Sequence, residues 1–367
     1  MTSISKDTAA ADPSSPDPGP DPGPAADAAT GWSRVTARDI AEELGVSVST
    51  VSRAFTENAV IAPETREKVH QAAERLGYQP NPFARSLITR RSKIAGIVVA
   101  DITNPFYPEV LASLTRRLQD TGLQTMLFFA GPGRKTDDAL PTLLQYSPDV
   151  AIVLAATMSS EMVTACRAAG TPVVLFNRYV PGSGAAAVCC DNFDGGRQVA
   201  EALAAAGHRR LAYIAGLPDT STNTDRLRGF VERCAQLGVE APIVEEGGSF
   251  TYEAGFTAVK RLMDRRNPPD AIFCANDIIA IGALDAARRE LGLSVPRELS
   301  VVGFDDISMA AWPSYSLTTV RQPVNAMIET TIDEAQRLLA HPQAQAEEHT
   351  LPGRLIRRGS ARLEETT

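Results

Sequence analysis

A cluster of hydroxyl side chains followed by one arginine is the first feature of this sequence with recognisable chemistry. The cluster comprises Ser47, Ser49, Thr50, Ser52 and Arg53. Hydroxyl groups near the start of a helix suit phosphate, because the free backbone N–H groups there already attract anions. An arginine can donate two hydrogen bonds to O6 and N7 of a guanine. The pattern therefore indicates contact with DNA, and the alternative is a small packed pair of helices with no such role.

Two short helices are predicted to position these side chains. Thr36 can cap the first helix, and Gly45 suits the left-handed residue that ends it. Ser47 can cap the second helix, in which Val51 and Phe55 face inward. Two helices joined by a turn with glycine form the helix-turn-helix, whose second helix enters the major groove of DNA.

A third helix completes this small domain. It is expected to begin at Pro63, which needs no backbone N–H at the first helical position, and to end at Gly77. The spacing of apolar residues leaves one position of the second helix ambiguous, because Val48 falls on the same inner face as Val51 and Phe55.

The charge of the chain is unevenly distributed. The net charge is −8, which by itself argues against nucleic acid. Residues 34–93, however, carry ten basic and seven acidic side chains, a net charge of +3. Residues 1–33 are rich in proline, aspartate and alanine with a net charge of −4, so they are predicted to form a disordered tail. We expect a helix-turn-helix domain over 34–78, a linker over 79–93 and a core over 94–367.

From residue 94 onward the chain alternates apolar strands with segments of helical length. The strands read as continuous apolar runs, as expected where helices cover both faces of a parallel sheet. This α/β region is long enough for two doubly wound lobes. Strands are predicted at 94–100, 125–129, 150–154, 172–176, 187–190, 210–215, 271–274 and 299–304, and the clearest helices at 107–121, 195–206, 225–237, 253–266 and 277–291.

Polar and aromatic side chains follow many of these strands. Ligands bind at strand ends in such sheets, in the cleft between two lobes. Carboxylates and an arginine suit ligand hydroxyls, while aromatic rings stack on a sugar ring or a base. For any one of these residues the alternative is a helix cap or a solvated charge. The candidates are Asp101, Phe106, Tyr107, Asn177, Arg178, Asp191, Asp277 and Asp305, with Arg226 at the start of a later helix.

Other classes of function find less support. The motifs GxGxxG, GxxxxGK[ST], GxSxG and HExxH do not occur, and the four histidines lack metal-ligand spacing, so no catalytic residue, cofactor or metal is expected. His208 is expected to be structural, and the five cysteines to be reduced, mostly buried thiols. Neither a membrane span nor a signal peptide is recognisable. This disfavours an exported solute-binding protein with a similar bilobal core and predicts a cytoplasmic protein.

Several motifs in order make the chain similar to the lactose-repressor (LacI/GalR) family of bacterial regulators. They include DIAEELGVSVSTVSRAF, TREKVHQAAERLGYQPN, GIVVADITNPFYPEV, DNFDGG, GHRRLAYIAG, FCANDIIAIGAL and VVGFDD, and the resemblance extends over everything except the acidic tail. The resemblance implies a repressor that binds double-stranded operator DNA under the control of a small, sugar-like effector, with a core similar to periplasmic binding proteins. The chain end lacks the leucine heptads that accompany tetramers in this family, so a homodimer is expected.

The same resemblance assigns DNA contacts on the second helix. Its phosphate-contacting positions hold Ser47, Thr50 and Ser52. Its base-reading positions hold Val48, Ser49 and Arg53. Val48 is therefore implied to be exposed, against the simple periodicity. With the linker, the expected DNA-binding residues are Thr36, Ser47, Val48, Ser49, Thr50, Ser52, Arg53, Asn81, Arg85 and Leu87.

The linker contains one further predicted helix. Asn81 can cap a helix over 82–88, which is too short to be stable alone in water. By the resemblance, this helix folds on operator DNA, where Leu87 inserts between base steps in the minor groove and Arg85 and Arg90 follow phosphates. The alternative, a solvated linker, is also the expected state without DNA.

In the core, the resemblance places some candidates at effector-contacting positions. These are Phe106, Tyr107, Asp191, Arg226 and Asp277, together with Thr220, Thr222 and Phe250 in more variable loops. The pair Asn177 and Arg178 is a common family variant, and its cation favours an acidic or phosphorylated effector. The expected effector-binding residues are Phe106, Tyr107, Asn177, Arg178, Asp191, Thr222, Arg226, Phe250, Asp277 and Asp305.

Overall fold

The structure is a computed structural model of the full chain, which divides into two compact units, Met1–Ala84 and Arg85–Thr367. It describes residues 35–56, 59–81, 91–131, 136–154 and 158–363. The expected acidic tail lies outside the described residues, as do the linker residues Arg85, Leu87 and Arg90. The two units are described separately below.

The first unit is the predicted three-helix domain, with α1 (Ala37–Leu44), α2 (Val48–Ala54) and α3 (Pro63–Leu76). Gly45 and Gly77 end α1 and α3 with φ angles of 64° and 69°, in the left-handed region that favours glycine. The inner faces of the three helices form one small core, with Ile40, Val51 and Val69 fully buried. The predicted caps and helix ends of this unit are confirmed.

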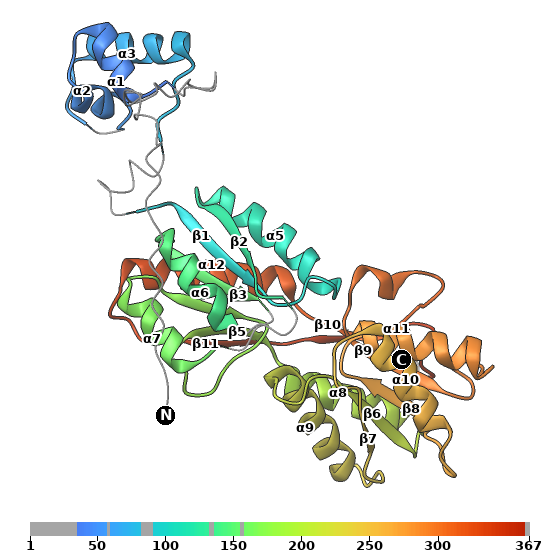
Figure 1. Ribbon diagram of the computed structural model, residues 1–367. Coiled ribbons are helices and arrows are strands. Elements are labelled where there is room, and N and C mark those ends of the chain that lie inside the picture. The colour runs from blue at the N-terminus through green and yellow to red at the C-terminus, as the bar shows by residue number, and fades with distance from the viewer. Residues whose placement is uncertain (1–34, 57–58, 82–90, 132–135, 155–157, 364–367) are drawn as a thin grey trace, which may run out of the picture. The chain divides into compact units, whose positions relative to one another are not determined.

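The second unit contains two six-stranded sheets (Figure 1), each at the centre of one lobe. The first has the order β11-β5-β4-β3-β1-β2 and all its paired strands are parallel. Its strands are β1 (Ile94–Val99), β2 (Gln124–Phe129), β3 (Val150–Leu154), β4 (Val173–Phe176), β5 (Ala186–Cys190) and β11 (Glu348–Leu351).

The second sheet repeats this arrangement. Its order is β12-β10-β9-β8-β6-β7, and all pairs are parallel except β10 with β12. Its strands are β6 (Leu211–Ala215), β7 (Ile243–Glu246), β8 (Ala271–Cys274), β9 (Ser300–Asp305), β10 (Thr318–Arg321) and β12 (Arg354–Ile356). The chain passes between the lobes after β5, after β10 and between β11 and β12.

Helices cover the faces of both sheets (Figure 1). The first lobe has α5 (Phe106–Asp120), α6 (Thr136–Gln145), α7 (Ser160–Ala168) and α12 (Val324–Ala340). The second has α8 (Asn192–Ala205), α9 (Ser221–Gln236), α10 (Tyr252–Met263), α11 (Asp277–Asp285), the π-helical turn Ala286–Glu290 and the 3-10 helix Ser308–Ala311. In the part of the chain that is described, no helix is long and apolar enough to cross a membrane.

All eight predicted strands are present, within one or two residues of the expected bounds. The sequence did not reveal β7, β10, β11 and β12. β7 and β11 are four-residue strands whose residues alternate between partly buried and exposed, so they lack an apolar run. β10 is buried, but it begins with Thr318 and Thr319, whose hydroxyls make hydrogen bonds inside the lobe.

Candidate DNA-binding and effector sites

The outer face of α2 presents the hydroxyl cluster and the arginine found in the sequence. The hydroxyl of Ser47 caps the helix by accepting from the Thr50 amide at 3.1 Å, and it also lies 2.8 Å from the Ser49 hydroxyl. Ser49, Ser52 and Arg53 are exposed. The Arg53 side chain runs back along the helix, where its Nε donates to the Ser49 carbonyl at 3.3 Å. This face offers hydroxyls, backbone N–H groups and a guanidinium together.

The burial pattern of α2 resolves the ambiguity at Val48. Its side chain is 48% exposed, whereas Val51 and Ala54 are fully buried. The placement of Val48 in the core, suggested by periodicity, is wrong, and the exposure implied by the resemblance is confirmed. Phe55, which was expected within the same helix, lies at its C-terminal cap, although it still packs against the core of this unit. It follows the last helical residue and packs against the rings of His70 and Tyr78, at centroid distances of 4.7 and 5.7 Å.

Arg66 of α3, which was not among the residues predicted from the sequence, binds the backbone at the end of α2. Its guanidinium donates to the carbonyls of Ala54 at 2.7 Å, Thr56 at 3.1 Å and Ala59 at 3.0 Å. The last carbonyls of a helix have no partner within the helix, so a cation at this end both satisfies and stabilises them. Arg66 thereby fixes the orientation of α2 on α3.

The remaining expected DNA contacts differ in their surroundings. Thr36 caps α1, and its amide and hydroxyl both donate to the Asp39 carboxylate, at 2.7 and 2.9 Å. These two bonds lower the pKa of Asp39. Asn81 is exposed at the end of the described part of this unit.

The second candidate site lies in the core and is centred on Arg226, near the start of α9. Its side chain is 2% exposed and its Nε donates to Asn192 Oδ1 at 2.8 Å. Its two terminal nitrogens donate to the Ala275 carbonyl at 2.5 Å and to Asp305 Oδ1 at 3.2 Å. The guanidinium also lies 3.6 Å from the centre of the Phe304 ring. Arg226 is thus held by residues at the carboxyl ends of β5, β8 and β9.

Asp305 is the anionic partner in this cluster. Its Oδ1 also accepts from Gln322 Nε2 at 2.8 Å. Burial raises the pKa of Asp305, while Arg226 and the hydrogen bonds act in the opposite direction. The backbone of Asp305 has a φ of 118°, and Asn177, at the corresponding end of β4, has a φ of 70°. Such strained conformations persist only where the surroundings impose them, and they gather at functional sites.

The first lobe contributes aromatic and amide groups to the same region. Phe106 and Tyr107 begin α5, are both buried, and pack edge to face at 5.2 Å. Asn177 Nδ2 donates to the Tyr107 hydroxyl at 3.1 Å. Burial raises the pKa of Tyr107. Arg178, which is 8% exposed, lies 5.4 Å from the ring of Phe250 in the second lobe.

Three buried amide atoms near these groups have no hydrogen-bond partner among the described residues. They are Asn177 Oδ1, Asn276 Nδ2 and Gln322 Oε1. A buried polar atom without a partner costs about 1–3 kcal/mol, so native proteins rarely leave several together. Two acceptors and one donor are therefore free for a bound molecule that can both donate and accept hydrogen bonds.

Comparisons with known proteins match both parts of the chain. The description "Bacterial regulatory proteins, lacI family" matches residues 36–81, and "Periplasmic binding protein-like domain" matches residues 200–361. The chain is 31% identical over 328 residues to the HTH-type transcriptional regulator GalS of Salmonella typhimurium, covering 89% of this chain and 96% of GalS. It is 33% identical over 302 residues to the HTH-type transcriptional regulator CelR of Thermobifida fusca, covering 80% and 88%. The chain belongs to the lacI family of bacterial regulatory proteins.

Solved structures of the lacI family show the same fold. The lac repressor dimer bound to operator and the anti-inducer ONPF matches with a TM-score of 0.80 at 26% identity, covering 89% of this chain and 99% of the repressor. The complex of the transcriptional regulator CelR with cellobiose matches with a TM-score of 0.67 at 30% identity, covering 89% and 100%. This lacI-family chain is a DNA-binding transcriptional regulator rather than an enzyme, since its relatives over most of its length are such regulators.

Two acidic residues expected at the effector site of this lacI-family core already accept hydrogen bonds from neighbouring residues of the protein. Asp277 is fully buried, and it accepts from Thr319 Oγ1 at 2.5 Å and from the Ile307 amide at 2.9 Å. Burial raises the pKa of Asp277 well above its usual range. Asp191 caps α8 by accepting from the Asp194 amide at 2.8 Å.

Two further candidates also have local partners. Asp101 accepts from the amide and the hydroxyl of Thr103, at 2.8 and 2.7 Å. Thr222 is buried near the start of α9, where its hydroxyl donates to that of Thr220 at 3.4 Å. For Asp191, the alternative of a helix cap describes the observed geometry, whereas Asp101 accepts hydrogen bonds within its own loop, before α5 begins.

Close packing of α8 against α9 positions the central arginine. A Cβ on Gly196 would lie 2.2 Å from the carbonyl oxygen of Arg226, and a Cβ on Gly229 would lie 2.0 Å from that of Phe193. Only glycine permits this approach of two helix backbones. The pair of glycines therefore brings Asn192 and Arg226, one from each helix, within hydrogen-bond distance.

The two lobes of the core also touch directly on both sides of this cluster. On one side the Tyr179 amide donates to Ser221 Oγ at 3.1 Å, and the Tyr179 hydroxyl donates to Asp225 at 2.9 Å. On the other side the Ser308 amide donates to Glu109 at 3.2 Å. The structure is thus a conformation in which the lobes meet.

The remaining histidine and cysteine predictions are confirmed. His208 is 2% exposed, lies 3.1 Å from Asp270 Oδ1, and contacts the Ser300 hydroxyl and the Arg362 carbonyl at 3.1 and 3.2 Å. It has a structural role in the second lobe. All five cysteines are free and buried.

Proposed function

We propose that this regulator is a dimeric, cytoplasmic repressor that reads operator DNA with α2, and that a small metabolite bound between the core lobes controls its operator affinity. The observation that carries the first half is the outer face of α2, where Arg53 stands exposed beside a helix start rich in hydroxyls. The similar lac repressor dimer binds operator, and by the family resemblance Ser47, Thr50 and Ser52 of this chain contact phosphates. Val48, Ser49 and Arg53 contact base edges.

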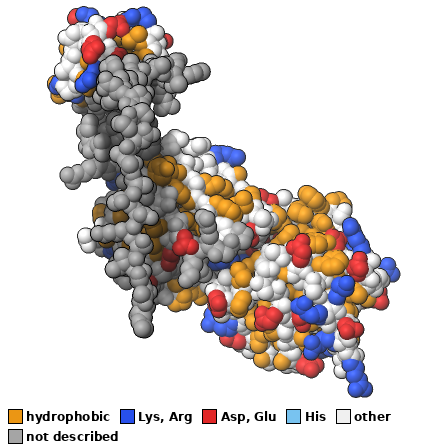
Figure 2. Space-filling model, viewed as in Figure 1, with side chains coloured by type: hydrophobic (Ala, Val, Ile, Leu, Met, Phe, Trp, Pro, Cys, Tyr) orange, Lys and Arg blue, Asp and Glu red, His pale blue; other side chains and the backbone are white. Residues whose placement is uncertain are grey.

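Dimerisation has support in the surface of the core. Leu127 and Phe129 on the edge strand β2 are 51% and 47% exposed, and Trp312 is 52% exposed. Neighbouring exposed apolar side chains, such as this pair on β2, can mark a contact surface. Acidic and basic side chains are interspersed on the visible face of the second lobe (Figure 2), as on ordinary solvated surface. We assign the apolar positions to contact with a second copy of the chain.

The proposed effector is a sugar or sugar derivative. A carbohydrate hydroxyl both donates and accepts, which matches the unpaired atoms of Asn177, Asn276 and Gln322. The rings of Phe106 and Phe250 supply apolar faces for a pyranose. CelR, a relative of similar fold, forms a complex with cellobiose. The buried cation of Arg178 favours an acidic or phosphorylated sugar.

A thermal-shift screen of sugars, sugar acids and sugar phosphates tests the effector site. A ligand at 100 times its Kd should stabilise the protein by about 2.7 kcal/mol. The variant Asn177→Gly removes an unpaired acceptor while suiting the observed φ of 70°. It should weaken the ligand found by about 2- to 12-fold, the range of one neutral hydrogen bond, and lower the melting temperature of the free protein, because the buried Tyr107 hydroxyl loses its donor. Equal affinity for parent and variant would place the ligand elsewhere.

DNA affinity tests the reading face. Arg53→Ala should cost about 1–3 kcal/mol per half-site and relax base discrimination there. Arg75→Ala is a matched control, because Arg75 is exposed in the last turn of α3 and pairs only with Glu43 in the described contacts. If both variants lost the same affinity, the effect would be one of general charge and the assignment of α2 would be wrong.

A further inference from the structure

The carboxylate of Asp149 holds Ser92 and Lys93, the entry segment through which the chain reaches β1. Its Oδ1 accepts from the amide and the hydroxyl of Ser92, at 2.8 and 3.0 Å, and its Oδ2 accepts from the Lys93 amide at 3.2 Å. The Ile94 amide donates to Ser92 Oγ at 3.2 Å. A single side chain, which is 9% exposed, thus binds three consecutive amides directly or through one hydroxyl.

The backbone of the entry segment has a conformation that its residue type does not favour. Lys93 has a φ of 56°, in the left-handed region. Contact of Cβ with the following carbonyl disfavours this region for an L residue by roughly 5- to 30-fold, whereas glycine adopts it readily. The Gln124 amide donates to the Lys93 carbonyl at 2.7 Å, so both peptide groups of Lys93 are bound. Such strain persists only where the surroundings impose it.

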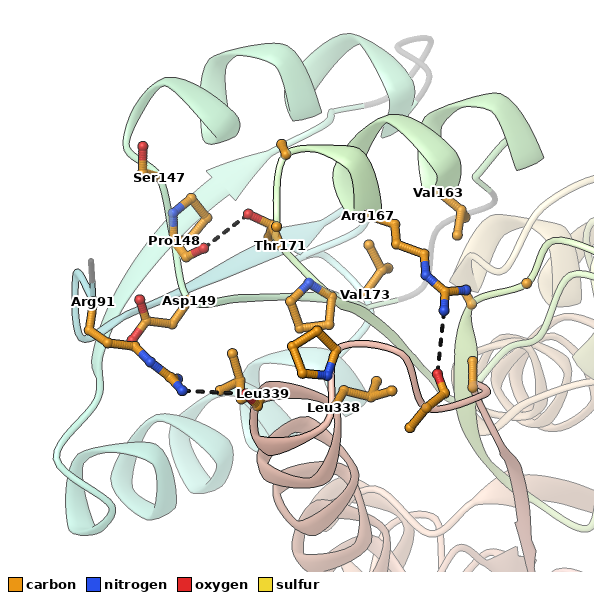
Figure 3. Close-up of a pocket in the computed structure, with 18 residues that line it drawn as sticks. Arg91, Ser147, Pro148, Asp149, Val163, Arg167, Thr171, Val173, Leu338 and Leu339 are labelled. Carbon is orange, nitrogen blue, oxygen red and sulfur yellow. Dashed lines mark hydrogen bonds between the residues drawn. The ribbon is translucent and has the colours of Figure 1, made fainter. Parts of the chain in front are cut away.

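Asp149 is itself attached to the interior strands of the first lobe (Figure 3). It directly precedes β3, and its amide donates to the Ile94 carbonyl of β1 at 2.8 Å. The carbonyl of Pro148 accepts from the hydroxyl of Thr171, a buried residue before β4, at 3.0 Å. The carboxylate therefore ties the entry segment to β1, β3 and β4.

The second lobe has an equivalent carboxylate without the strained residue. Asp270 directly precedes β8 and accepts from the amides of Arg209 and Arg210, which precede β6, at 3.3 Å each. The left-handed residue before β6 is Gly207, with a φ of 80°, so no side chain opposes that conformation. A carboxylate at this place can thus order the start of a strand without strain. The first lobe differs in that the chain reaches it from the DNA-binding unit.

We propose that Asp149 is a positioning residue for operator binding. By holding Lys93 in the left-handed region, its carboxylate fixes the direction of the backbone where the chain coming from residues 82–90 enters β1. A segment that is already ordered loses less conformational entropy when the protein assembles on DNA. Asp149 thereby raises operator affinity without contacting DNA. This inference rests on the proposed function, in which the DNA-binding unit and the core act on one operator.

The operator affinity of the full-length protein tests this role, with a duplex selected from random DNA as the probe. Asp149→Ala should lower the affinity by about 5- to 30-fold for each chain, the range that corresponds to freeing the backbone of one residue. Asp270→Ala is the matched control, because it removes the equivalent carboxylate of the second lobe. Its affinity should stay within about twofold of the parent at a temperature where all three proteins are folded. Equal losses in the two variants would overturn the proposal.

Substitutions of Lys93 distinguish a held backbone from a general loss of structure. In the Asp149→Ala background, Lys93→Gly should bind the operator at least about threefold more tightly than Lys93→Ala, since only glycine returns readily to the left-handed region. Both substitutions remove the lysine charge, so its attraction to phosphates does not affect their comparison. With Asp149 present the two should differ by less than about twofold, because the carboxylate already imposes the conformation. Equal affinities of the two double variants would contradict a role of this backbone.

Hydrogen exchange of the free protein separates this inference from the proposed function. Peptides that span Ser92 and Lys93 should exchange faster in Asp149→Ala, because both amides lose their acceptor. Unchanged exchange would mean that Asp149 does not hold the entry segment. If the parent protein selected no specific DNA sequence, the proposed function would fail, while the exchange of these two amides would still decide whether Asp149 orders the segment.

Discussion

Arg226 is the residue on which most of the effector cluster depends. It neutralises Asp305, bonds Asn192 and the Ala275 carbonyl, and lies against Phe304. All of these contacts are buried. Residues at the carboxyl ends of three strands, β5, β8 and β9, thus share one central cation.

We expect Arg226→Ala to destabilise the core strongly. Removing one partner of a buried ion pair leaves an uncompensated charge and costs about 3–5 kcal/mol. Urea unfolding followed by circular dichroism measures this loss. Arg228→Ala is a control, because the Arg228 side chain is 56% exposed. It pairs with Asp225 at 3.2 Å and lies 4.7 Å from the centre of the Phe193 ring, and its effect should stay below about 1 kcal/mol. Equal stability of the two variants would contradict the central role of Arg226.

For single residues, the sequence predicted where in the fold the effector cluster lies better than it predicted which side chains form it. It pointed to Arg226, Asn177 and Asp305, which the structure brings together, but it missed Asn192, Asn276 and Gln322. The end of a strand can be recognised in the sequence, because the apolar run stops there. Whether the next side chain points into the site or into the lobe depends on the backbone turn, which the sequence pattern does not reveal. Asn276 and Asp277 show this, since one caps α11 with an unpaired amide nitrogen and the other turns into the lobe.

Among the elements, α2 is a seven-residue helix that cannot be stable by itself. Its orientation comes from burial of Val51 and Ala54 and from Arg66, which binds the carbonyls that follow it. The sequence showed the start of this helix through Ser47, because a cap is a local signal. Its end depends on a side chain twelve residues away in α3, which no local pattern reveals.

Arg66→Ala should therefore weaken the DNA-binding unit and leave the core unaffected. Losing hydrogen bonds from a charged group to carbonyls costs about 1.5–3 kcal/mol. Differential scanning calorimetry of the full chain should show the transition of the small unit at a lower temperature, with the transition of the core unchanged. A shift of the core transition alone, or no shift at all, would mean that Arg66 does not anchor α2.

At the scale of the whole core, a charged network joins α12 to β11, the two elements with which the chain returns to the first lobe. Glu334 is 3% exposed, and both of its oxygens accept from Arg337 at 2.7 Å. Glu347 donates its amide to the same carboxylate at 3.3 Å, and His349 lies 3.5 Å away. Burial acts to raise the pKa of Glu334, but the bonds from Arg337 and Glu347 outweigh it, so the pKa lies below its ordinary value.

This lowered pKa predicts how stability depends on pH. The contribution of Glu334 is present above the unfolded pKa of a glutamate, about 4.3, and is lost as the pH falls through the lower folded pKa. Glu334→Gln should cost about 1–3 kcal/mol at pH 7, less than a fully buried pair because Arg337 is partly exposed. The difference from the parent should shrink below pH 4. A difference that stayed constant from pH 7 to pH 3 would exclude this carboxylate as its source.

The central claim, that this molecule reads a specific operator as a symmetric dimer, is tested most directly by selection from random DNA. The full-length protein is incubated with duplexes carrying roughly 30 random base pairs, long enough for two half-sites one or two helical turns apart, and the bound fraction is sequenced. We predict enrichment of one near-palindromic sequence, with a guanine in each half-site whose preference disappears in Arg53→Ala. Recovery of unrelated sequences without a shared palindrome, or of the same motif with both proteins, would contradict the account.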